Sequence, residues 1–499
     1  MTEIIFSYAL CMAGVIVADA FVRPTASGAR LGLRDAWGIW VILLFASAMF
    51  SVVFALSGNA TLSAIATTTL HAVVAIASNA KRRVLGEPLL FSDLALVGAM
   101  FKHPQFYFSV LALWQQVLGV GIVLALAATL AVFFSPSLRA AGLGAGAALI
   151  SSGLLLASLK LLALGEAART PDADRDVRKF GLVTTLSLYW MRWREARADL
   201  VRKSARPEVK APQTALTPRG IDDLIIVVQC ESFADPADLF EDAAEPLPHL
   251  SRAKSEGVQW GHLNVSGFGA YTMRTEFGVL FGREEEALGF LLYDPYLTAL
   301  DDPAPALPQK LEPGRWDSLF VHPHDMRFYA RDQILPKAGF DQLVGEDQFA
   351  EPDRSHGRYV RDGEVASKIL KLAEDARRPS LIYAVTMENH GPWAPRGDAS
   401  VASMVENYDR LVRAGDAMLG QLLDGLADIG KPTTLVFFGD HRPTIPGASE
   451  PGGEKHTPYV IVQLGHDDTG GKSARQRAAR RSDLTPAQLH QAILDCAAG

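Results

Sequence analysis

The stretch TTLVFFGDHRP, from Thr433 to Pro443, joins a short apolar run to a cluster of charged groups. Its first six residues are β-branched, aliphatic or aromatic, which is the composition of a strand buried inside a sheet. An acid and a histidine, Asp440 and His441, follow almost directly. The stretch therefore predicts a buried strand with polar side chains just beyond its carboxyl end.

Four further runs of the same kind occur in the second half of the chain: LIIVVQ (Leu224–Gln229), SLFVH (Ser318–His322), LIYAVT (Leu381–Thr386) and YVIVQL (Tyr459–Leu464). Helical patterns alternate with them. The clearest runs from about residue 402 to 427, and DLTPAQLHQAIL predicts a last helix with Thr485 as its N-cap. This alternation predicts one doubly wound α/β domain over residues 218–499.

Polar residues follow four of the five predicted strands. Ligands of such sheets bind beyond the carboxyl ends of the strands. A single acid or histidine at a strand end is usually a helix cap or a turn residue. Several of them in one domain instead predict a common site, and the residues concerned are Glu231, His322, His324, Asp325, Glu388, His390, Asp440 and His441.

Three of these groups suit a divalent metal ion. Two carboxylates and one imidazole, from Glu231, Asp440 and His441, fit Mn²⁺, Mg²⁺ or Zn²⁺. The sequence contains no Cys-x-x-Cys pair and no His-Glu-x-x-His helix that would compete as a metal site. A hydroxyl as fourth ligand would become a nucleophile at neutral pH, as metal-bound water does. The candidate hydroxyls are Thr272, within GFGAYTMRTEFGVLFG (Gly267–Gly282), and Ser232, Ser266 and Thr275.

Hydrophobic residues make up 49% of the 499 residues, and they are concentrated in long apolar stretches in the first third of the chain. Five stretches of about 20 residues could each cross roughly 30 Å of hydrocarbon as a helix. We therefore expect a bundle of about five transmembrane helices over residues 1–165. The first stretch could be a signal peptide, but it lacks a basic start and a small-residue cleavage site, so we expect it to be retained. The stretches are Ile4–Val22, Ala36–Leu56, Thr61–Ala80, Leu111–Phe134 and Ala140–Leu164.

Residues 166–217 are rich in charged residues and predict a linker between the two domains. Within it, KFGLVTTLSLYWMRWREARADL (Lys179–Leu200) has the pattern of an amphipathic helix. Its aromatic residues suit either a membrane interface or packing beneath a domain.

Composition excludes two classes of protein. Three cysteines, Cys11, Cys230 and Cys496, give no disulfide framework. The net charge is −7, and no basic stripe of the kind that nucleic-acid binding requires is present.

Several segments, taken in order, resemble the lipoteichoic acid synthase and phosphoglycerol transferase family, whose members are sulfatase-like proteins of the alkaline phosphatase superfamily. The segments are VVQCES, GAYTMRTEF, FYARDQ, TMENHGPW, FFGDHRP and HTPYVIV. The stretch LGEPLLFSDL (Leu85–Leu94) is similar to the loop that follows the third span in that family. The resemblance therefore extends over nearly the whole chain.

The resemblance implies a membrane-bound phosphoglycerol transferase. Glu231, Asp440 and His441 would bind one divalent metal ion, Mn²⁺ in the first place and Mg²⁺ or Zn²⁺ as alternatives. Thr272 would be the fourth ligand and the nucleophile. It would take glycerol phosphate from phosphatidylglycerol, forming a phospho-threonine intermediate, and pass it to an extracytoplasmic glycan or polymer acceptor.

The resemblance also implies three substrate-binding residues. Tyr329 and Arg331 would hold the lipid headgroup, and His390 would contact the phosphate. The sequence departs from the family pattern at the nucleophile, where Met273 and Arg274 replace a serine and an aspartate, and at Tyr329, which replaces a tryptophan. These departures leave the identity of headgroup and acceptor open.

Two other functions stay open as alternatives. A phosphoethanolamine transferase would share the spans, the metal and the threonine, although such relatives usually carry several disulfides. A sulfatase-like phosphodiester hydrolase is the other; a sulfatase proper would need a Cys-x-Pro-x-Arg or Ser-x-Pro-x-Arg segment, which CESFAD at Cys230 does not provide. His322 and His324 match no position of the family pattern, so we expect them to be structural.

Charge and resemblance disagree about topology. Basic residues of the first and third loops lie on the same side of the predicted spans as the C-terminal domain, and the positive-inside rule places that side in the cytoplasm. The family instead carries its catalytic domain outside the cytoplasmic membrane. Because the lipid headgroups and glycans that it uses lie there, we expect a multi-pass inner-membrane protein with an extracytoplasmic catalytic domain. The basic residues are Arg23, Arg30, Arg34, Lys81, Arg82 and Arg83.

Overall fold

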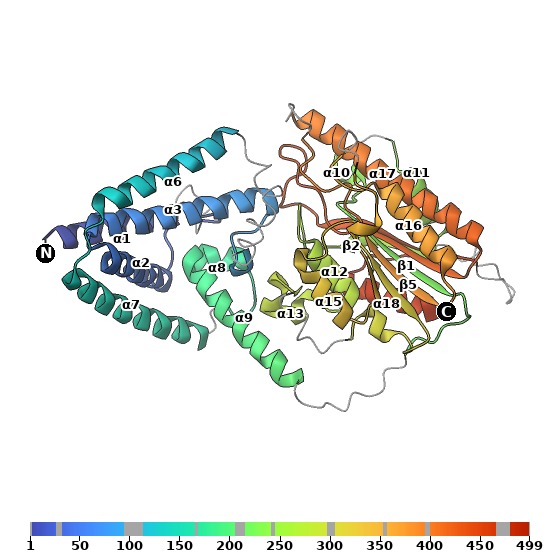
Figure 1. Ribbon diagram of the computed structural model, residues 1–499, viewed down its shortest axis with the longest axis horizontal. Coiled ribbons are helices and arrows are strands. Elements are labelled where there is room, and N and C mark those ends of the chain that lie inside the picture. Colours follow the sequence, from blue (N-terminus) through green and yellow to red (C-terminus); the bar gives the residue numbers. More distant parts are fainter. Residues whose placement is uncertain are drawn as a thin grey trace. The chain divides into compact units, whose positions relative to one another are not determined.

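The computed structural model describes residues 2–25, 32–93, 113–164, 168–204, 215–240, 245–296, 305–352, 357–394, 400–465 and 480–498. The chain forms two compact units, Met1–Ala196 and Arg197–Gly499, drawn in Figure 1 and described here one at a time.

Helices build the first unit: α1 (Thr2–Ala20), α2 (Ala36–Ser57), α3 (Ala60–Leu85), α6 (Leu113–Phe133) and α7 (Leu138–Leu164). Among the described residues, α1, α2, α3 and α7 are long and apolar enough to cross a membrane, judged by length and composition. Helix α6 contains a shorter apolar segment, Gly119–Phe133. We predicted a bundle of about five such helices, and the structure confirms an N-terminal bundle of four to five apolar helices. The start of the fourth predicted span, before Leu113, lies outside the described residues.

Caps and one buried ion pair fix the ends of these helices. The side chain of Asp35 accepts a hydrogen bond of 2.7 Å from the backbone N–H of Gly38 at the start of α2. Next to this cap, the Nε of Arg34 lies 2.7 Å from a carboxylate oxygen of Asp19. The other oxygen of Asp19 accepts from the backbone N–H of Leu182 at 3.1 Å. The bundle tolerates these buried charges because each has a partner.

The amphipathic helix predicted after the spans is divided in two, as α8 (Ala173–Phe180) and α9 (Leu182–Ser204). Gly181 separates them with φ of 82°. A Cβ atom at this position would lie 2.7 Å from the carboxylate of Asp19. Both the backbone conformation and the available space therefore require glycine at this break.

Eight strands form one sheet in the second unit, in the order β4-β3-β5-β1-β6-β7-β2-β8. The five predicted strands are all present, so the predicted α/β fold is confirmed. The sheet is mixed, because β7 runs antiparallel to both β6 and β2 while β4, β3, β5, β1 and β6 are parallel. The bounds are β1 (Leu224–Cys230), β2 (Gln259–Asn264), β3 (Asp317–Val321), β4 (Gln342–Val344), β5 (Ser380–Val385), β6 (Thr433–Gly439), β7 (His456–Leu464) and β8 (Arg480–Arg481).

Helices cover both faces of this sheet (Figure 1). One face carries α11 (Pro248–Glu256), α16 (Asp362–Asp375) and α17 (Val401–Ile429), and the other carries α12 (Thr272–Phe281), α15 (Arg331–Lys337) and α18 (Pro486–Ala498). Two short helices, α10 (Pro236–Leu239) and α13 (Glu285–Leu288), complete the unit. The hydroxyl of Thr485 accepts from the N–H of Gln488 at 3.2 Å, which confirms the predicted N-cap of α18.

The direction of the strands decides where the polar residues meet. The carboxyl ends of β1, β3, β5 and β6 lie at one edge of the sheet because these strands are parallel. Strand β7 runs the other way, so its amino end, at His456, lies at the same edge. We call this the polar edge.

Candidate active site and metal centre

Two neighbouring strands bring the predicted metal ligands together. Cys230 and Gly439, the last residues of β1 and β6, are paired across the sheet, and Glu231 and Asp440 follow them. The Nε2 of His441 lies 3.3 Å from an oxygen of Glu231 and 3.7 Å from an oxygen of Asp440. One ligand atom from each of the three residues lies within 4.8 Å of the other two, and all three side chains are buried.

Hydrogen bonds hold two of the four carboxylate oxygens of this group. The backbone N–H of Ser232 donates to Oδ1 of Asp440 at 2.8 Å. The hydroxyl of Ser232 donates to Oε1 of Glu231 at 2.9 Å. Among the described residues, Oδ2 of Asp440 has no hydrogen-bond partner although it is buried. A buried carboxylate oxygen normally has a partner, and here a cation would supply it.

The electrostatics of the cluster also favour a cation. Burial raises the pKa of Asp440 to about 7, and the negative charge of Glu231 adds to the rise. Burial acts in the same direction on Glu231, but a hydrogen bond and positive charge from His441 bring the pKa of Glu231 down to about 2. Burial opposes the charged form of His441, yet the two carboxylates raise its pKa to about 9. Two carboxylates and one imidazole, crowded and dehydrated in this way, fit Mn²⁺, Mg²⁺ or Zn²⁺.

Thr272 is the first residue of α12 and lies against this cluster. Its hydroxyl is close enough to the carboxylate of Asp440 to lower the pKa of that acid. The preceding residue, Tyr271, has φ of 80°, a left-handed conformation that turns the chain into the helix. The partial positive charge of a helix N-terminus favours negative charge on a group at that place. The structure thus gives this hydroxyl the surroundings that a nucleophile at phosphorus needs.

The other candidate hydroxyls have different surroundings. That of Ser232 is bonded to Glu231, and that of Thr275 donates to the backbone carbonyl of Asp440 at 2.8 Å. The hydroxyl of Ser266 is buried without a hydrogen-bond partner among the described residues.

His390 follows β5 and lies at the polar edge. Its Nδ1 is 2.8 Å from the backbone oxygen of Gly391 and 3.5 Å from the hydroxyl of Tyr359. Its charge acts on Glu231 and lowers the pKa of that acid. The imidazole is thus close enough to Glu231 to act on its charge, and its contact with a phosphate stays a prediction.

Arg331, which the sequence interpretation assigned to the headgroup, is buried in an ion pair. Its Nε and Nη2 donate to the two oxygens of Glu276 at 3.0 and 2.6 Å. Its Nη1 lies 3.1 Å from Nε2 of His322, whose Nδ1 donates to the carbonyl of Val385 at 3.0 Å. Burial and the charge of Arg331 lower the pKa of His322 well below its usual value, so the neutral ring accepts from the arginine.

The geometry restricts what Arg331 can still do. A guanidinium has five N–H groups, and among the described residues three of them have partners and two have none. The ring of Tyr329, which the sequence interpretation also assigned to the headgroup, lies 5.2 Å from the guanidinium. The sequence interpretation missed Glu276, which is also hydrogen-bonded to Tyr296. Its position four residues after Thr272, on one face of a helix, is the signal that could have found it.

Left-handed backbone conformations gather beside these residues. Apart from glycine, five described residues have positive φ, and four of them directly precede or follow a predicted site residue or lie within FYARD. Such conformations cost free energy and concentrate at functional sites. The four are Ser232 (49°), Tyr271 (80°), Tyr329 (60°) and Ala330 (54°).

A second group of possible ligands lies at the amino end of β7. Single ligand atoms of Asp238, His262 and His456 lie within 4.8 Å of one another, and the two imidazoles are stacked at 3.8 Å. However, Nη2 of Arg442 is 2.8 Å from Nε2 of His456. This positive charge opposes a cation at the second group.

Comparisons with known proteins agree with this architecture. The profile of the family described as Sulfatase matches residues 223–498, more than half of the chain. The capsular polysaccharide biosynthesis protein RkpI of Rhizobium meliloti (strain 1021) is 30% identical over 462 residues, which cover 89% of this chain and 84% of that protein.

Solved structures of low sequence identity share the fold. The integral membrane protein lipooligosaccharide phosphoethanolamine transferase A of Neisseria meningitidis matches with a TM-score of 0.56 and 13% identity, over 92% of this chain and 95% of that chain. The phosphoglycerol transferase GacH of Streptococcus pyogenes matches with a TM-score of 0.43 and 16% identity, over 62% of this chain and 80% of that one. The family match and the relative at 30% identity show that the chain belongs to the sulfatase family.

Proposed function

We propose that this protein is a membrane-anchored phosphotransferase that moves glycerol phosphate from phosphatidylglycerol to a glycan or polymer acceptor, with Thr272 as nucleophile. The observation that carries the proposal is the buried group of Glu231, Asp440 and His441, beside which Thr272 stands as the first residue of α12. A divalent ion held by these residues would lower the pKa of the hydroxyl and offset charge on the phosphate.

The reaction would proceed in two displacements. In the first, the oxygen of Thr272 forms a bond to phosphorus, the bond from phosphorus to the diacylglycerol oxygen breaks, and diacylglycerol takes up a proton. In the second, a hydroxyl oxygen of the acceptor forms a bond to phosphorus, the bond from phosphorus to the oxygen of Thr272 breaks, and the threonine takes up the proton that the acceptor hydroxyl loses. His390 would stabilise charge on the phosphoryl oxygens or protonate the leaving oxygen.

The headgroup would meet Tyr329 and the two N–H groups of Arg331 that have no partner among the described residues. Glu276 holds the guanidinium in a fixed plane by two hydrogen bonds, so the arginine would be a rigid donor to an oxygen-rich headgroup. The name of the relative RkpI refers to capsular polysaccharide, which supports a glycan as acceptor. A phosphoethanolamine donor, or hydrolysis of a phosphodiester, is the alternative within the same chemistry.

In this proposal residues 1–165 form the membrane anchor, 166–217 the linker and 218–499 the catalytic domain, which lies outside the cytoplasmic membrane. The preferred ion is Mn²⁺, with Mg²⁺ or Zn²⁺ as alternatives. The apolar helices of the first unit support the anchor, and the carboxylate-rich ligand group supports a divalent ion.

Mass spectrometry of the purified full chain tests the proposal. The protein is incubated with Mn²⁺ and either phosphatidylglycerol or phosphatidylethanolamine, and the peptide that contains Thr272 is analysed for an added phosphoglycerol or phosphoethanolamine group. We expect the phosphoglycerol adduct in the wild type and in Thr275→Ala, and its loss in Thr272→Ala. An adduct from phosphatidylethanolamine alone would select the alternative donor, and an adduct that persists in Thr272→Ala would refute the assignment of the nucleophile.

A further inference from the structure

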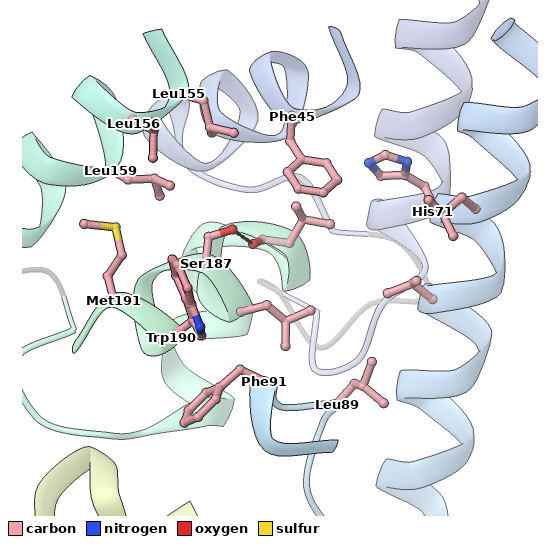
Figure 2. Close-up of a pocket in the computed structure, with 14 residues that line it drawn as sticks. Phe45, His71, Leu89, Phe91, Leu155, Leu156, Leu159, Ser187, Trp190 and Met191 are labelled. Atoms are coloured by element: carbon pink, nitrogen blue, oxygen red, sulfur yellow. Dashed lines mark hydrogen bonds between the residues drawn. The ribbon is translucent and has the colours of Figure 1, made fainter. Parts of the chain in front are cut away.

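The first unit, Met1–Ala196, which we call the membrane unit, contains a cavity of about 580 Å³ that the proposed reaction does not use. Its walls come from α2, α3, α7, α9 and the segment after α3, all within the first compact unit (Figure 2). A cavity of roughly 300–1,000 Å³ is the size at which proteins bind small molecules. We ask what this one would hold.

The lining is almost entirely hydrocarbon. Leucine, valine, phenylalanine and methionine side chains form most of it, and the hydroxyl of Ser187 is satisfied within its own helix by the carbonyl of Val183 at 2.8 Å. His71 is the other polar residue. Its Nδ1 lies 2.9 Å from the carbonyl of Thr67 in the preceding turn of α3. Such a lining favours an apolar occupant.

The cavity has a deep end and an end near charged groups. Figure 2 shows His71 and Phe45 on one side of the space, and Trp190 and Phe91 on the other. His71 precedes Lys81 by ten residues, or about 15 Å along α3. Lys81 pairs with Asp93, which marks the level of the polar interface. The occupant is therefore long and reaches from the interface towards the middle of the bilayer.

A positive charge lies at the interfacial end. The guanidinium of Arg194 stacks on the ring of Trp190 at 4.8 Å, one turn of α9 further on. Among the described residues, no carboxylate pairs with Arg194. A cation held on an indole ring at the membrane surface complements a phosphate group.

We infer that this cavity is a phospholipid site, which takes one acyl chain of an anionic lipid with its terminal methyl near His71 and its phosphate at Arg194. The inference goes beyond the proposed transfer reaction, because it requires neither the metal cluster nor Thr272. The Nε2 of His71 has no hydrogen-bond partner among the described residues. A hydrocarbon chain bound beside it would also offer no hydrogen bond to this nitrogen.

The test uses the full chain in lipid nanodiscs with a chelator present, so that no turnover is needed. The probes are phosphatidylglycerol and diacylglycerol with the same chains and a diazirine at the chain end. Light should attach both probes to α2 and α3 near Phe45 and His71, with phosphatidylglycerol binding about fivefold more tightly. In Arg194→Gln that preference should disappear.

One matched pair of variants, together with Arg194→Gln, makes the inference falsifiable. Leu156→Trp, which fills the cavity from α7, should reduce labelling by either probe at least tenfold. Leu149→Trp is the matched control, since it makes the same change at an exposed position of α7 that does not line the cavity. Equal labelling of the two variants would overturn the site, and so would an unchanged headgroup preference in Arg194→Gln.

His71→Phe removes the unpaired nitrogen and keeps an aromatic ring, so labelling should be unchanged or stronger. If labelling instead falls about tenfold, the ligand forms a hydrogen bond to His71 through a hydroxyl group. That result would overturn the inference that a plain acyl chain lies beside His71. If the protein forms no adduct on Thr272 with either donor lipid but is labelled by the probes as described, the proposed function fails and the lipid site stands.

Discussion

Replacing Asp440 with asparagine should stabilise the metal-free protein and reduce the stabilisation that metal gives. In the metal-free protein the ionised carboxylate is buried beside Glu231, and its pKa is raised from 3.8 to about 7. The ionised form therefore destabilises the folded state fully above pH 7 and not at all below about pH 3.8. Since a tenfold change in proton affinity is worth about 1.4 kcal/mol, the penalty at pH 8 is about 4 kcal/mol.

An asparagine of the same shape removes this penalty. It also removes one of the negative charges that raise the pKa of His441 to about 9, so part of the gain is lost. We expect the metal-free variant to be about 1–3 kcal/mol more stable than the wild type at pH 8. Metal at 100 times its dissociation constant stabilises the wild type by about 2.7 kcal/mol. A tenfold loss of affinity in the variant would reduce that gain to about 1.4 kcal/mol.

Hydrogen exchange of the β1 and β6 amides measures these quantities on the strands next to the site, without assuming that two units unfold together. The exchange is followed in chelator and in saturating Mn²⁺. Asp416→Asn is the control, because Asp416 is a buried carboxylate that accepts from the N–H groups of His249 and Leu250 at the start of α11, away from the cluster. Its variant should keep the full metal effect. Faster exchange of Asp440→Asn in chelator, or an undiminished metal effect, would refute the reasoning.

Four further outcomes are expected. Thr272→Ala should release no burst of diacylglycerol from a fluorescent phosphatidylglycerol, whereas Thr272→Ser keeps a slow one; a normal burst from the alanine variant would contradict the mechanism. His390→Ala should slow the burst by roughly 10²- to 10⁴-fold without abolishing it, and a wild-type rate would remove His390 from the site. Glu276→Gln should destabilise the sheet by about 3–5 kcal/mol, measured by hydrogen exchange of β5, because it leaves Arg331 buried without its counter-charge; an unchanged exchange rate would show that the pair is dispensable. An alkaline phosphatase fused to the C-terminus should be active, and activity of a cytoplasmic reporter instead would reverse the proposed topology.

The central strands could be predicted because burial on both faces leaves a strong pattern in the sequence. Every residue of β1, β5 and β6 is buried, and each reads as a continuous apolar or β-branched run. The edge strands carry no such pattern. Strand β2, QWGHLN, is partly exposed and polar, while β4 has three residues and β8 has two. The direction of β7 is also invisible in its composition, since an antiparallel strand that is buried looks like a parallel one.

The sequence allowed the neighbours of a residue to be predicted better at the ends of strands than for side chains whose partners lie far away in the sequence. Glu231 and Asp440 each follow a predicted strand, and the parallel pairing of β1 and β6 brings them together. The partner of Arg331 could not be read in this way, because Glu276 is 55 residues distant. Burial of an arginine requires a counter-charge, but only the fold decides which acid supplies it.

Three of the six basic loop residues that suggested a cytoplasmic location, Arg34, Lys81 and Arg82, are in ion pairs. Arg34 pairs with Asp19, and Lys81 pairs with Asp93. Each pair joins segments of the membrane unit, so these basic residues have a use in holding it together. Their number is then a poor guide to the orientation of the chain.

The four left-handed residues beside the site also bear on how the enzyme would lose activity on heating. Each such conformation costs roughly 1–2 kcal/mol in a residue with a side chain, and all four adjoin Glu231, Thr272 or Arg331. Local unfolding of the loops at the polar edge therefore costs less free energy than unfolding of the strands that support them. Heat would release these loops first, and inactivation would precede unfolding of the sheet. Glycine at Ser232 or Tyr271 would relieve the local cost, and the temperature of inactivation would then move towards that of unfolding.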